Sequence, residues 1–241
     1  MNDYRPGTRF GPATGERITR EALEQWLAHV HAVDASGDSR FSDDGEGEGE
    51  IGFAVPDGMA LRPAAVLILV INHGGRPAVL FTQRTAHLTD HAGQISFPGG
   101  RVEEDDRDVH HTALREAEEE TGVDAARIEI IGRIPQYTTG TGYLITPVVG
   151  WLEPPVDYRP DPTEVAECFE VPLDYLIDMR NHRIESAMYK GRMRSYYAIC
   201  YDRRYIWGAT AGMLVTLTRV LAAAQGSPAG APIRAALDSG A

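Results

Sequence analysis

Three glutamates in one short segment are the residues of this sequence best suited to chemistry. They occupy positions 116, 119 and 120 within REAEEETGV, residues 115–123. On a helix, where each residue advances about 100°, the side chains of Glu119 and Glu120 would point roughly −60° and +40° from that of Glu116. Glu118, at roughly 200°, would lie on the opposite side. The segment therefore predicts a helix with one strongly acidic face.

Like charges at these spacings repel one another, and an ordinary solvated helix mixes charge signs to avoid this. Arg115 can reach Glu119 one turn away, but one guanidinium group does not neutralise three carboxylates. A bound Mg²⁺ ion would relieve the repulsion, because it takes oxygen ligands and keeps positions open for water and for phosphate oxygens. The pattern predicts a metal platform, and a solvated helix face is the alternative.

The residues around this segment agree with such a site. A Pro-Gly-Gly sequence at 98–100 offers a backbone carbonyl as a further ligand and lets phosphates approach closely. The acidic helix is expected from about Val109 to Glu120, with Gly122 ending it. His110 and His111 point about 100° apart on a helix, so we interpret them as helix-start residues and not as metal ligands.

The composition of the chain restricts the classes of function. Its 241 residues carry 23 Lys and Arg against 35 Asp and Glu, and the net charge of −12 disfavours nucleic acid polymers and membrane surfaces as partners. With only Cys168 and Cys200, neither a disulfide framework nor a structural zinc site is expected. No signal peptide and no apolar run long enough to span a bilayer is evident. We expect a soluble cytoplasmic protein.

Several apolar runs predict the elements that position the acidic helix. AAVLILVI, residues 64–71, and AVLFTQR, residues 78–84, predict a hairpin around the turn at 72–77. Glu164, which precedes VAECFEV, is compatible with the first turn of a helix. Further strands are predicted at residues 93–97, 127–134, 143–152 and 196–202. An apolar helix is predicted at residues 207–224.

The N-terminal part is predicted to be an extension. Apolar residues recur there at helical spacing, at Ile18, Leu23, Trp26, Leu27 and Val30. This stripe either packs on the chain's own domain or pairs two copies in a homodimer. The Gly- and Glu-rich segment that follows cannot repay the entropy of ordering and is predicted to be a linker. The predicted parts are an extension (1–50), the main domain (51–224) and a loose tail (225–241).

REAEEETGV resembles the second half of the Nudix box, in which Arg-Glu, an apolar residue, any residue, Glu-Glu, any residue, Gly and an apolar residue follow one another. The opening Gly and the later acid of that box fall at Gly100 and Asp106 if one residue is inserted. Such spacing is known in the Nudix branch that hydrolyses coenzyme A and its thioesters. The upstream segment is similar to a second motif of that branch at Arg84, Leu88, His91, Gly93, Phe97, Pro98, Gly99 and Gly100.

The resemblance extends over roughly residues 60 to 224. It implies the Nudix fold, a mixed β-sheet in an α/β/α sandwich with the acidic helix against the sheet. It also implies a diphosphatase that uses Mg²⁺ or Mn²⁺ and cuts coenzyme A into 3′,5′-ADP and the phosphopantetheine part. Arg115 would orient the metal-binding carboxylates. The implied metal ligands are Glu116, Glu119, Glu120 and the carbonyl of Gly100.

The same resemblance leaves the base and the substrate contacts to be assigned. The residue that deprotonates water is Glu119, Glu120 or Glu164. Arg84 can clamp a phosphate, and the 3′-phosphate of coenzyme A is a suitable group. The complete set of expected substrate-binding residues is Arg84, His91, Gly99, Gly100 and Tyr143.

Two other functions remain open. The same site could act on ADP-ribose, a dinucleotide or a damaged nucleoside triphosphate, and dependence on the 3′-phosphate separates these substrates from coenzyme A. A non-enzymatic Nudix-fold ligand sensor is the third reading. Such sensors commonly lack metal-binding glutamates, whereas all three are present here, which favours an enzyme.

Overall fold

The computed structural model describes residues 18–35, 60–86, 93–189 and 192–224. A mixed sheet of eight strands forms its centre, in the order β3-β2-β1-β7-β5, with β4 also pairing with β1, β6 with β7, and β8 with β2. The predicted linker, the boundary near Glu50, the C-terminal tail, Leu88 and His91 lie outside the described residues. The strands are β1 (Arg62–Asn72), β2 (Pro77–Arg84), β3 (Ile95–Ser96), β4 (Gly99–Arg101), β5 (Glu129–Arg133), β6 (Tyr137–Thr138), β7 (Tyr143–Leu152) and β8 (Val165–Pro172).

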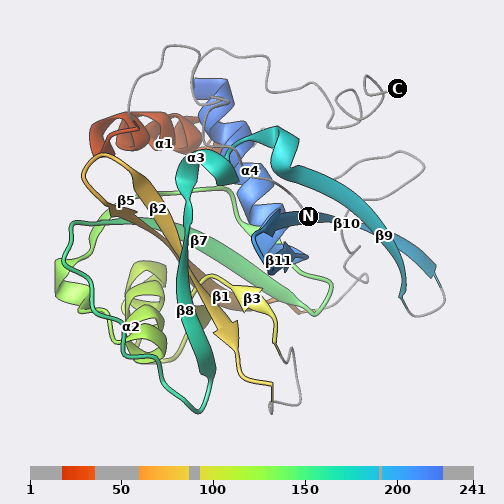
Figure 1. Cartoon of the computed structure of the whole chain (residues 1–241), viewed down its shortest axis with the longest axis horizontal. Coiled ribbons are helices and arrows are strands. Elements are labelled where there is room, and N and C mark those ends of the chain that lie inside the picture. The colour runs from red at the N-terminus through yellow and green to blue at the C-terminus, as the bar shows by residue number, and fades with distance from the viewer. Residues whose placement is uncertain (1–17, 36–59, 87–92, 190–191, 225–241) are drawn as a thin grey trace.

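Helices cover both faces of this sheet, because the central strand β1 is apolar on both sides. Leu67 and Leu69 belong to the hydrophobic cluster that contains α2, whereas Ile68 and Val70 belong to the cluster that contains α1 and α4. This alternation places α2 on one face and α1 with α4 on the other (Figure 1). The predicted α/β/α sandwich is confirmed. The helices are α1 (Arg20–Ala35), α2 (Val109–Thr121), α3 (Leu173–Leu176) and α4 (Ala209–Ala224).

The predicted hairpin and the long elements are present. β1 and β2 pair antiparallel, β1 and β7 pair parallel, and β7 and α4 occupy the segments expected of them. The helical interpretation of the segment after Glu164 is wrong, because that segment forms β8. Its residue Phe169 pairs with Phe81 of β2, and the two rings stack with centroids 5.6 Å apart. Burial of Phe169 against the sheet decides in favour of a strand.

The apolar stripe of α1 packs on its own chain. Leu23 and Leu27 are fully buried in the cluster shared with α4 and the sheet. A Cβ atom on Gly132 of β5 would overlap Leu27, so helix and sheet approach closely at this point. Of the two partners predicted for the stripe, its own domain is the one observed.

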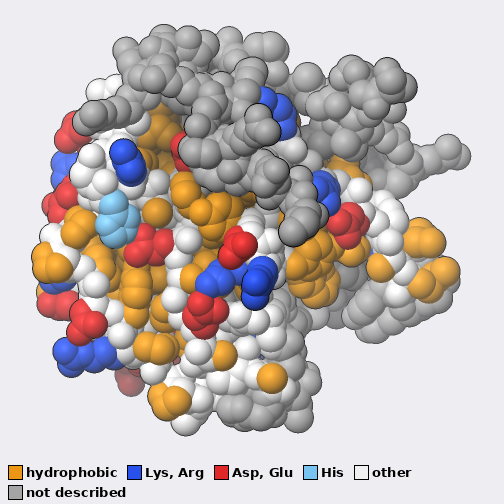
Figure 2. Space-filling model, in the orientation of Figure 1, with side chains coloured by type: hydrophobic (Ala, Val, Ile, Leu, Met, Phe, Trp, Pro, Cys, Tyr) orange, Lys and Arg blue, Asp and Glu red, His pale blue; other side chains and the backbone are white. Residues whose placement is uncertain are grey.

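A second sheet projects from the body beside α4. It consists of β9 (His182–Tyr189), β10 (Arg192–Tyr201) and β11 (Arg204–Trp207), in the order β11-β10-β9. Its inner part is buried, as at Ile199 and Ile206, while hydrophobic side chains are exposed at its outer end (Figure 2). Met188 and Met193 are among them, at 66% and 65% exposure. Of this sheet, the sequence predicted only the second half of β10.

Two expectations from composition can be compared with the structure. Cys168 and Cys200 are both free thiols, in agreement with the expected lack of a disulfide framework. Across the described ranges, no helix combines the length and the hydropathy needed to cross a bilayer.

Candidate active site

The helix α2 is defined at both ends by its own residues. The Asp108 side chain accepts a hydrogen bond from the backbone N–H of His111 at 2.8 Å, which caps the first turn. Gly122 has φ of 70°, a left-handed conformation that suits glycine, and its N–H donates to the carbonyl of Glu118. Ala113 and Ala117 are fully buried towards the sheet. The predicted helix and its stop are confirmed.

Glu120 is the most deeply buried of the three glutamates, with 7% of its surface exposed. Its carboxylate accepts hydrogen bonds from the hydroxyl of Thr82 at 3.1 Å and from the N–H of Gly99 at 3.4 Å. Burial raises the pKa of Glu120 to about 7, against the effect of these two donors. The negative charges of Glu116 and Glu164 raise it further, so Glu164 lies near the acidic face.

Glu116 lies against the backbone of β4. A Cβ atom on Gly100 would overlap the Glu116 carboxylate, so any other residue at position 100 would displace this side chain. Burial raises the pKa of Glu116, opposed by Arg115, and the charge of Glu119 raises it further. The side chain of Glu119 is 59% exposed. The three glutamates therefore share one face but differ in depth.

Arg115 joins this face to the loop that precedes the helix. Two of its nitrogens donate to the Asp106 carboxylate, each at 3.0 Å, and the Asp106 side chain is only 1% exposed. Hydrogen bonds from Arg115 hold the pKa of Asp106 well below its usual value. Arg115 also contacts Glu116 at 3.0 Å and Glu119 at 3.1 Å. One guanidinium group thus fixes two of the three carboxylates.

The donor set of this face fits a hard divalent cation. Its groups are carboxylate oxygens, and the missing side chain of Gly100 lets the Glu116 carboxylate lie against the backbone of β4. Among the described residues, no group of three His, Cys, Asp or Glu side chains is gathered at metal-binding distances. The three carboxylates do not converge on one point because Arg115 holds Glu116 and Glu119, while Thr82 and Gly99 hold Glu120.

The predicted substrate residues fall into two places. Arg84, at the end of β2, lies 3.9 Å from the Glu164 carboxylate, and the N–H of Gly99 points to Glu120. Tyr143, at the start of β7, accepts a hydrogen bond from Arg101 of β4 at 2.8 Å. The carbonyl of Arg101 also accepts a hydrogen bond from Arg115 at 3.2 Å. The second place is therefore linked to α2 through Arg101, as the first is through Gly99.

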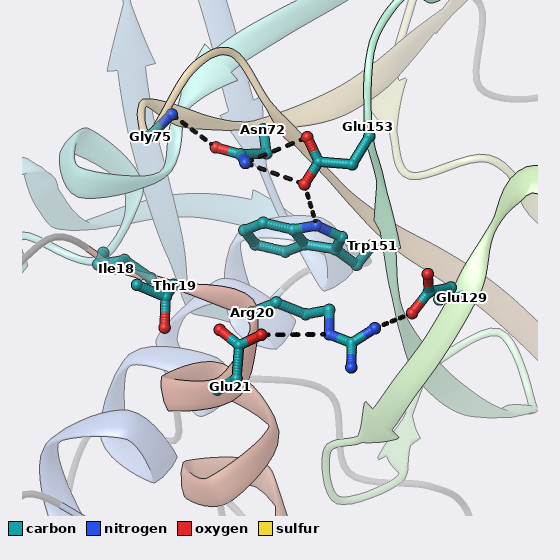
Figure 3. A pocket seen from close by; sticks show the side chains of 9 residues that line it. All are labelled: Ile18, Thr19, Arg20, Glu21, Asn72, Gly75, Glu129, Trp151 and Glu153. Carbon is teal, nitrogen blue, oxygen red and sulfur yellow. Dashed lines mark hydrogen bonds and ion pairs between the residues drawn. The ribbon is translucent and has the colours of Figure 1, made fainter.

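A cavity of about 620 Å³ lies elsewhere and is lined by none of the predicted site residues. Figure 3 shows its lining, with Glu153 facing Asn72 and the indole of Trp151. Asn72 ends β1, whereas Gly100 pairs with Ala65 near its start. Seven residues of strand correspond to roughly 20 Å, so this cavity and the glutamates lie at opposite ends of β1.

A family model for the NUDIX domain matches residues 61–190, more than half of the chain. The chain belongs to the Nudix family. The protein named "Uncharacterized Nudix hydrolase NudL" from Escherichia coli O1:K1 / APEC is 39% identical over 153 residues, which cover 64% of this chain and 79% of the relative. This Nudix protein is a hydrolase of diphosphate bonds in nucleoside diphosphate-linked compounds, and its family generally uses divalent cations.

Solved structures similar to this Nudix chain are more distant. The Nudix hydrolase RenU of M. smegmatis has a TM-score of 0.42 at 24% identity, covering 51% of this chain and 83% of its own. The Ap4A hydrolase of C. elegans, in a binary complex, has a TM-score of 0.40 at 20% identity, covering 46% of this chain and 80% of its own. At these scores neither structure informs the choice of substrate.

Sequence reasoning missed several contacts of the Nudix site. Thr82 hydrogen-bonds to Glu120 although 38 residues separate them, and nothing in its strand distinguishes it from other threonines. Asp106 was matched to the Nudix box, but its contact with Arg115 was not expected. Arg62 and Arg101, which both contact Tyr143, were not singled out, although Arg101 directly follows the glycine pair.

Proposed function

We propose that this protein hydrolyses the diphosphate bond of coenzyme A or its derivatives with Mg²⁺ or Mn²⁺, giving 3′,5′-ADP and the (acyl-)phosphopantetheine part. The observation that carries the proposal is the acidic face of α2 beside Gly100. Three carboxylates lie there without enough positive charge to balance them, and burial and mutual repulsion raise the pKa values of Glu116 and Glu120. A diphosphate neutralised by divalent cations fits such a face.

Glu116, Glu119 and Glu120, with the carbonyl of Gly100, would hold the cation. A divalent cation supplies charge neutralisation of the phosphoryl oxygens and lowers the pKa of a bound water molecule. Arg115 acts as a positioning residue, because it contacts two of the carboxylates and the buried Asp106 at once.

Proton transfer is assigned to a carboxylate near the site. Glu164 is a candidate beside Glu119 and Glu120, because its charge affects Glu120 and it lies 3.9 Å from Arg84. We expect Glu164→Gln to remove the basic group from the pH dependence of turnover while leaving the melting temperature unchanged. Normal turnover of this variant across the pH range would exclude Glu164 and leave Glu119 and Glu120.

The substrate assignment rests on the resemblance of residues 80–100 to the motif of the coenzyme A branch. Arg84, Gly99 and Gly100 of this motif are among the residues that the structure describes. The test is a mass-spectrometric product assay with Mg²⁺ and then Mn²⁺ on coenzyme A, 3′-dephospho-coenzyme A and ADP-ribose. Glu119→Gln serves as the inactive variant. Glu118→Gln is the matched control, because Glu118 is exposed on the opposite side of the same helix.

Formation of 3′,5′-ADP from coenzyme A by the wild type and by Glu118→Gln, but not by Glu119→Gln, is the expected result. Cleavage of ADP-ribose alone would retain the role of α2 and contradict the coenzyme A assignment. Lack of activity on all three substrates with both metals would contradict the proposed function and favour a ligand sensor.

A further inference from the structure

Two arginines at the start of β1 take no part in the proposed mechanism. Arg62 opens β1 and Arg101 ends β4, while Tyr143 opens β7. Arg62 is the pairing partner of Tyr143, and Arg101 is the pairing partner of Ala64 two residues further along β1. Three segments, about 40 residues apart in sequence, thus bring these residues together at one end of the strands β1, β4 and β7.

Both guanidinium groups contact the ring of Tyr143. The Cζ atom of Arg62 lies 4.1 Å from the ring centroid and that of Arg101 lies 5.5 Å from it, within the roughly 6 Å of a cation–π contact. Arg101 donates through Nε to the Tyr143 hydroxyl at 2.8 Å, and Arg62 donates through Nη2 to the carbonyl of Thr141 at 3.0 Å. Each guanidinium has five N–H donors, so most remain available for a ligand.

Neither arginine forms an ion pair with a carboxylate of the described residues, although the chain carries a net charge of −12. Arg84, Arg115 and Arg204 each have a carboxylate partner. Two cations held at one ring repel each other, and an anion bound between them would be stabilised by both. The planar fork of a guanidinium group matches the oxygens of a phosphate.

This cationic pair lies beside the acidic face of α2. Gly100 packs against the Glu116 carboxylate, and Arg101 is the next residue of the same strand. Because successive strand residues point to opposite faces, the Arg101 side chain lies on the other side of β4 from Glu116. The backbone of β4 separates the two groups, so a molecule with its diphosphate at the glutamates has to pass around β4 to place a second anionic group at the arginines.

We propose that Arg62 and Arg101 bind a phosphomonoester of the substrate, separate from the diphosphate that is cleaved, and that Tyr143 holds both guanidinium groups in place. This inference rests on the proposed function, because it assigns a second substrate group to the same site. In coenzyme A the group is the 3′-phosphate. We assign that phosphate to this pair and not to Arg84, because the Glu164 carboxylate 3.9 Å from Arg84 would repel it.

The test measures binding, so that it does not depend on turnover. Calorimetry with adenosine 3′,5′-bisphosphate and with AMP, in the presence of Mg²⁺, compares the wild type with Arg62→Ala and Arg101→Ala. The wild type should bind the bisphosphate about 10- to 100-fold more tightly than AMP. Each variant should lose most of this preference while its affinity for AMP stays unchanged. Arg101→Lys should restore part of it, because the charge returns without the planar fork.

Arg76→Ala is the matched control. Arg76 is exposed in the turn between β1 and β2, at the far end of β1 from Arg62, and its removal changes the net charge equally. This control should keep the full preference for the bisphosphate. An equal loss in Arg76→Ala would reveal a general charge effect and overturn the assignment.

Three further outcomes separate this inference from the proposed function. Equal affinity of the wild type for both nucleotides overturns the phosphomonoester site even if coenzyme A is hydrolysed. A preference that depends on Arg62 and Arg101 supports the site even if no diphosphate is cleaved, in which case only the proposed function fails. If inorganic phosphate alone binds as tightly as the bisphosphate, the site takes free phosphate and its assignment to the substrate is overturned.

Discussion

The two ends of β1 hold charged residues in opposite conditions. At the far end, around the cavity of Figure 3, Glu153 accepts hydrogen bonds from the Trp151 indole at 2.8 Å and from the Asn72 amide at 2.9 Å, and Glu129 pairs with Arg20. At the near end, the glutamates of α2 crowd together with one arginine between two of them. The cavity thus lies where these carboxylates already have partners.

We place the proposed site at the near end by its unbalanced charge and not by concavity. Polar groups with partners stabilise the fold and gain little from a ligand. Groups that repel each other, such as the carboxylates on α2 or the two guanidinium groups at Tyr143, gain free energy when a ligand of opposite charge binds. The experiments that follow test whether turnover depends on the near end of β1 and not on the far end.

The largest effect is expected for Glu120→Gln at the near end. Loss of the carboxylate should lower turnover by about 10²- to 10³-fold, because a charged ligand for the cation is removed. The melting temperature should not fall, since a neutral amide costs less to bury than a carboxylate and can still accept from Thr82. Turnover and melting temperature are measured beside Glu118→Gln. Unchanged turnover would contradict the assignment of Glu120.

Asp106→Asn should have the largest effect on stability. The Asp106 side chain is 1% exposed, and Arg115 keeps Glu116 and Glu119 as partners, so loss of the Asp106 charge should cost about 2 kcal/mol of unfolding free energy at pH 6. The folded state holds the pKa of Asp106 below its usual value, so this stabilisation is complete above the unfolded pKa of about 4 and is lost as the pH falls below it. The difference between wild type and variant should therefore narrow towards pH 3.

Urea unfolding at pH 6 and at pH 3 measures this change. A difference between the two proteins that stays constant with pH would show that the Asp106 carboxylate contributes through packing and not through its charge.

Arg115→Lys should have an intermediate effect. A lysine keeps the charge but cannot contact Asp106, Glu116 and Glu119 together, so turnover should fall about 10- to 100-fold. Arg20→Lys is the matched control at the far end, because Arg20 also contacts several carboxylates, those of Glu21, Glu24 and Glu129. A comparable loss of turnover in Arg115→Lys and Arg20→Lys would contradict the proposal that only the near end of β1 takes part in catalysis.

The smallest effect is expected for Glu153→Gln in the cavity. Its charge strengthens hydrogen bonds from Trp151 and Asn72, and the variant should lose about 1 kcal/mol of stability. Turnover should stay within about twofold of the wild type. A fall in turnover with an unchanged melting temperature would instead connect the cavity to catalysis.

Local features of this fold could be predicted from sequence. The apolar run of β1, the hairpin turn before β2 and the stop of α2 at Gly122 depend on neighbouring residues, and all three are confirmed. Strand β8 was misassigned because its outward positions carry polar residues and its burial depends on pairing with β2. Short strands such as β4 and β6 have too few residues for any periodicity.

The site was predictable only where its residues are close in sequence. The acidic face of α2 follows from helix geometry, and its residues are where that geometry puts them. The contacts of Thr82 with Glu120, of Glu164 with Arg84, and of Arg101 with Tyr143 depend on the register between distant strands. Register is decided by the packing of the whole sheet, which no single segment encodes.

The ion pair between Arg115 and Asp106 has a consequence for the evolution of this sequence. Loss of Arg115 leaves the Asp106 carboxylate, which is 1% exposed, without its cation, whereas loss of the Asp106 charge leaves Arg115 with Glu116 and Glu119 alone. We therefore expect the two positions, nine residues apart, to tolerate substitution together better than singly. Glu118, exposed on the opposite side of the same helix, is free to drift.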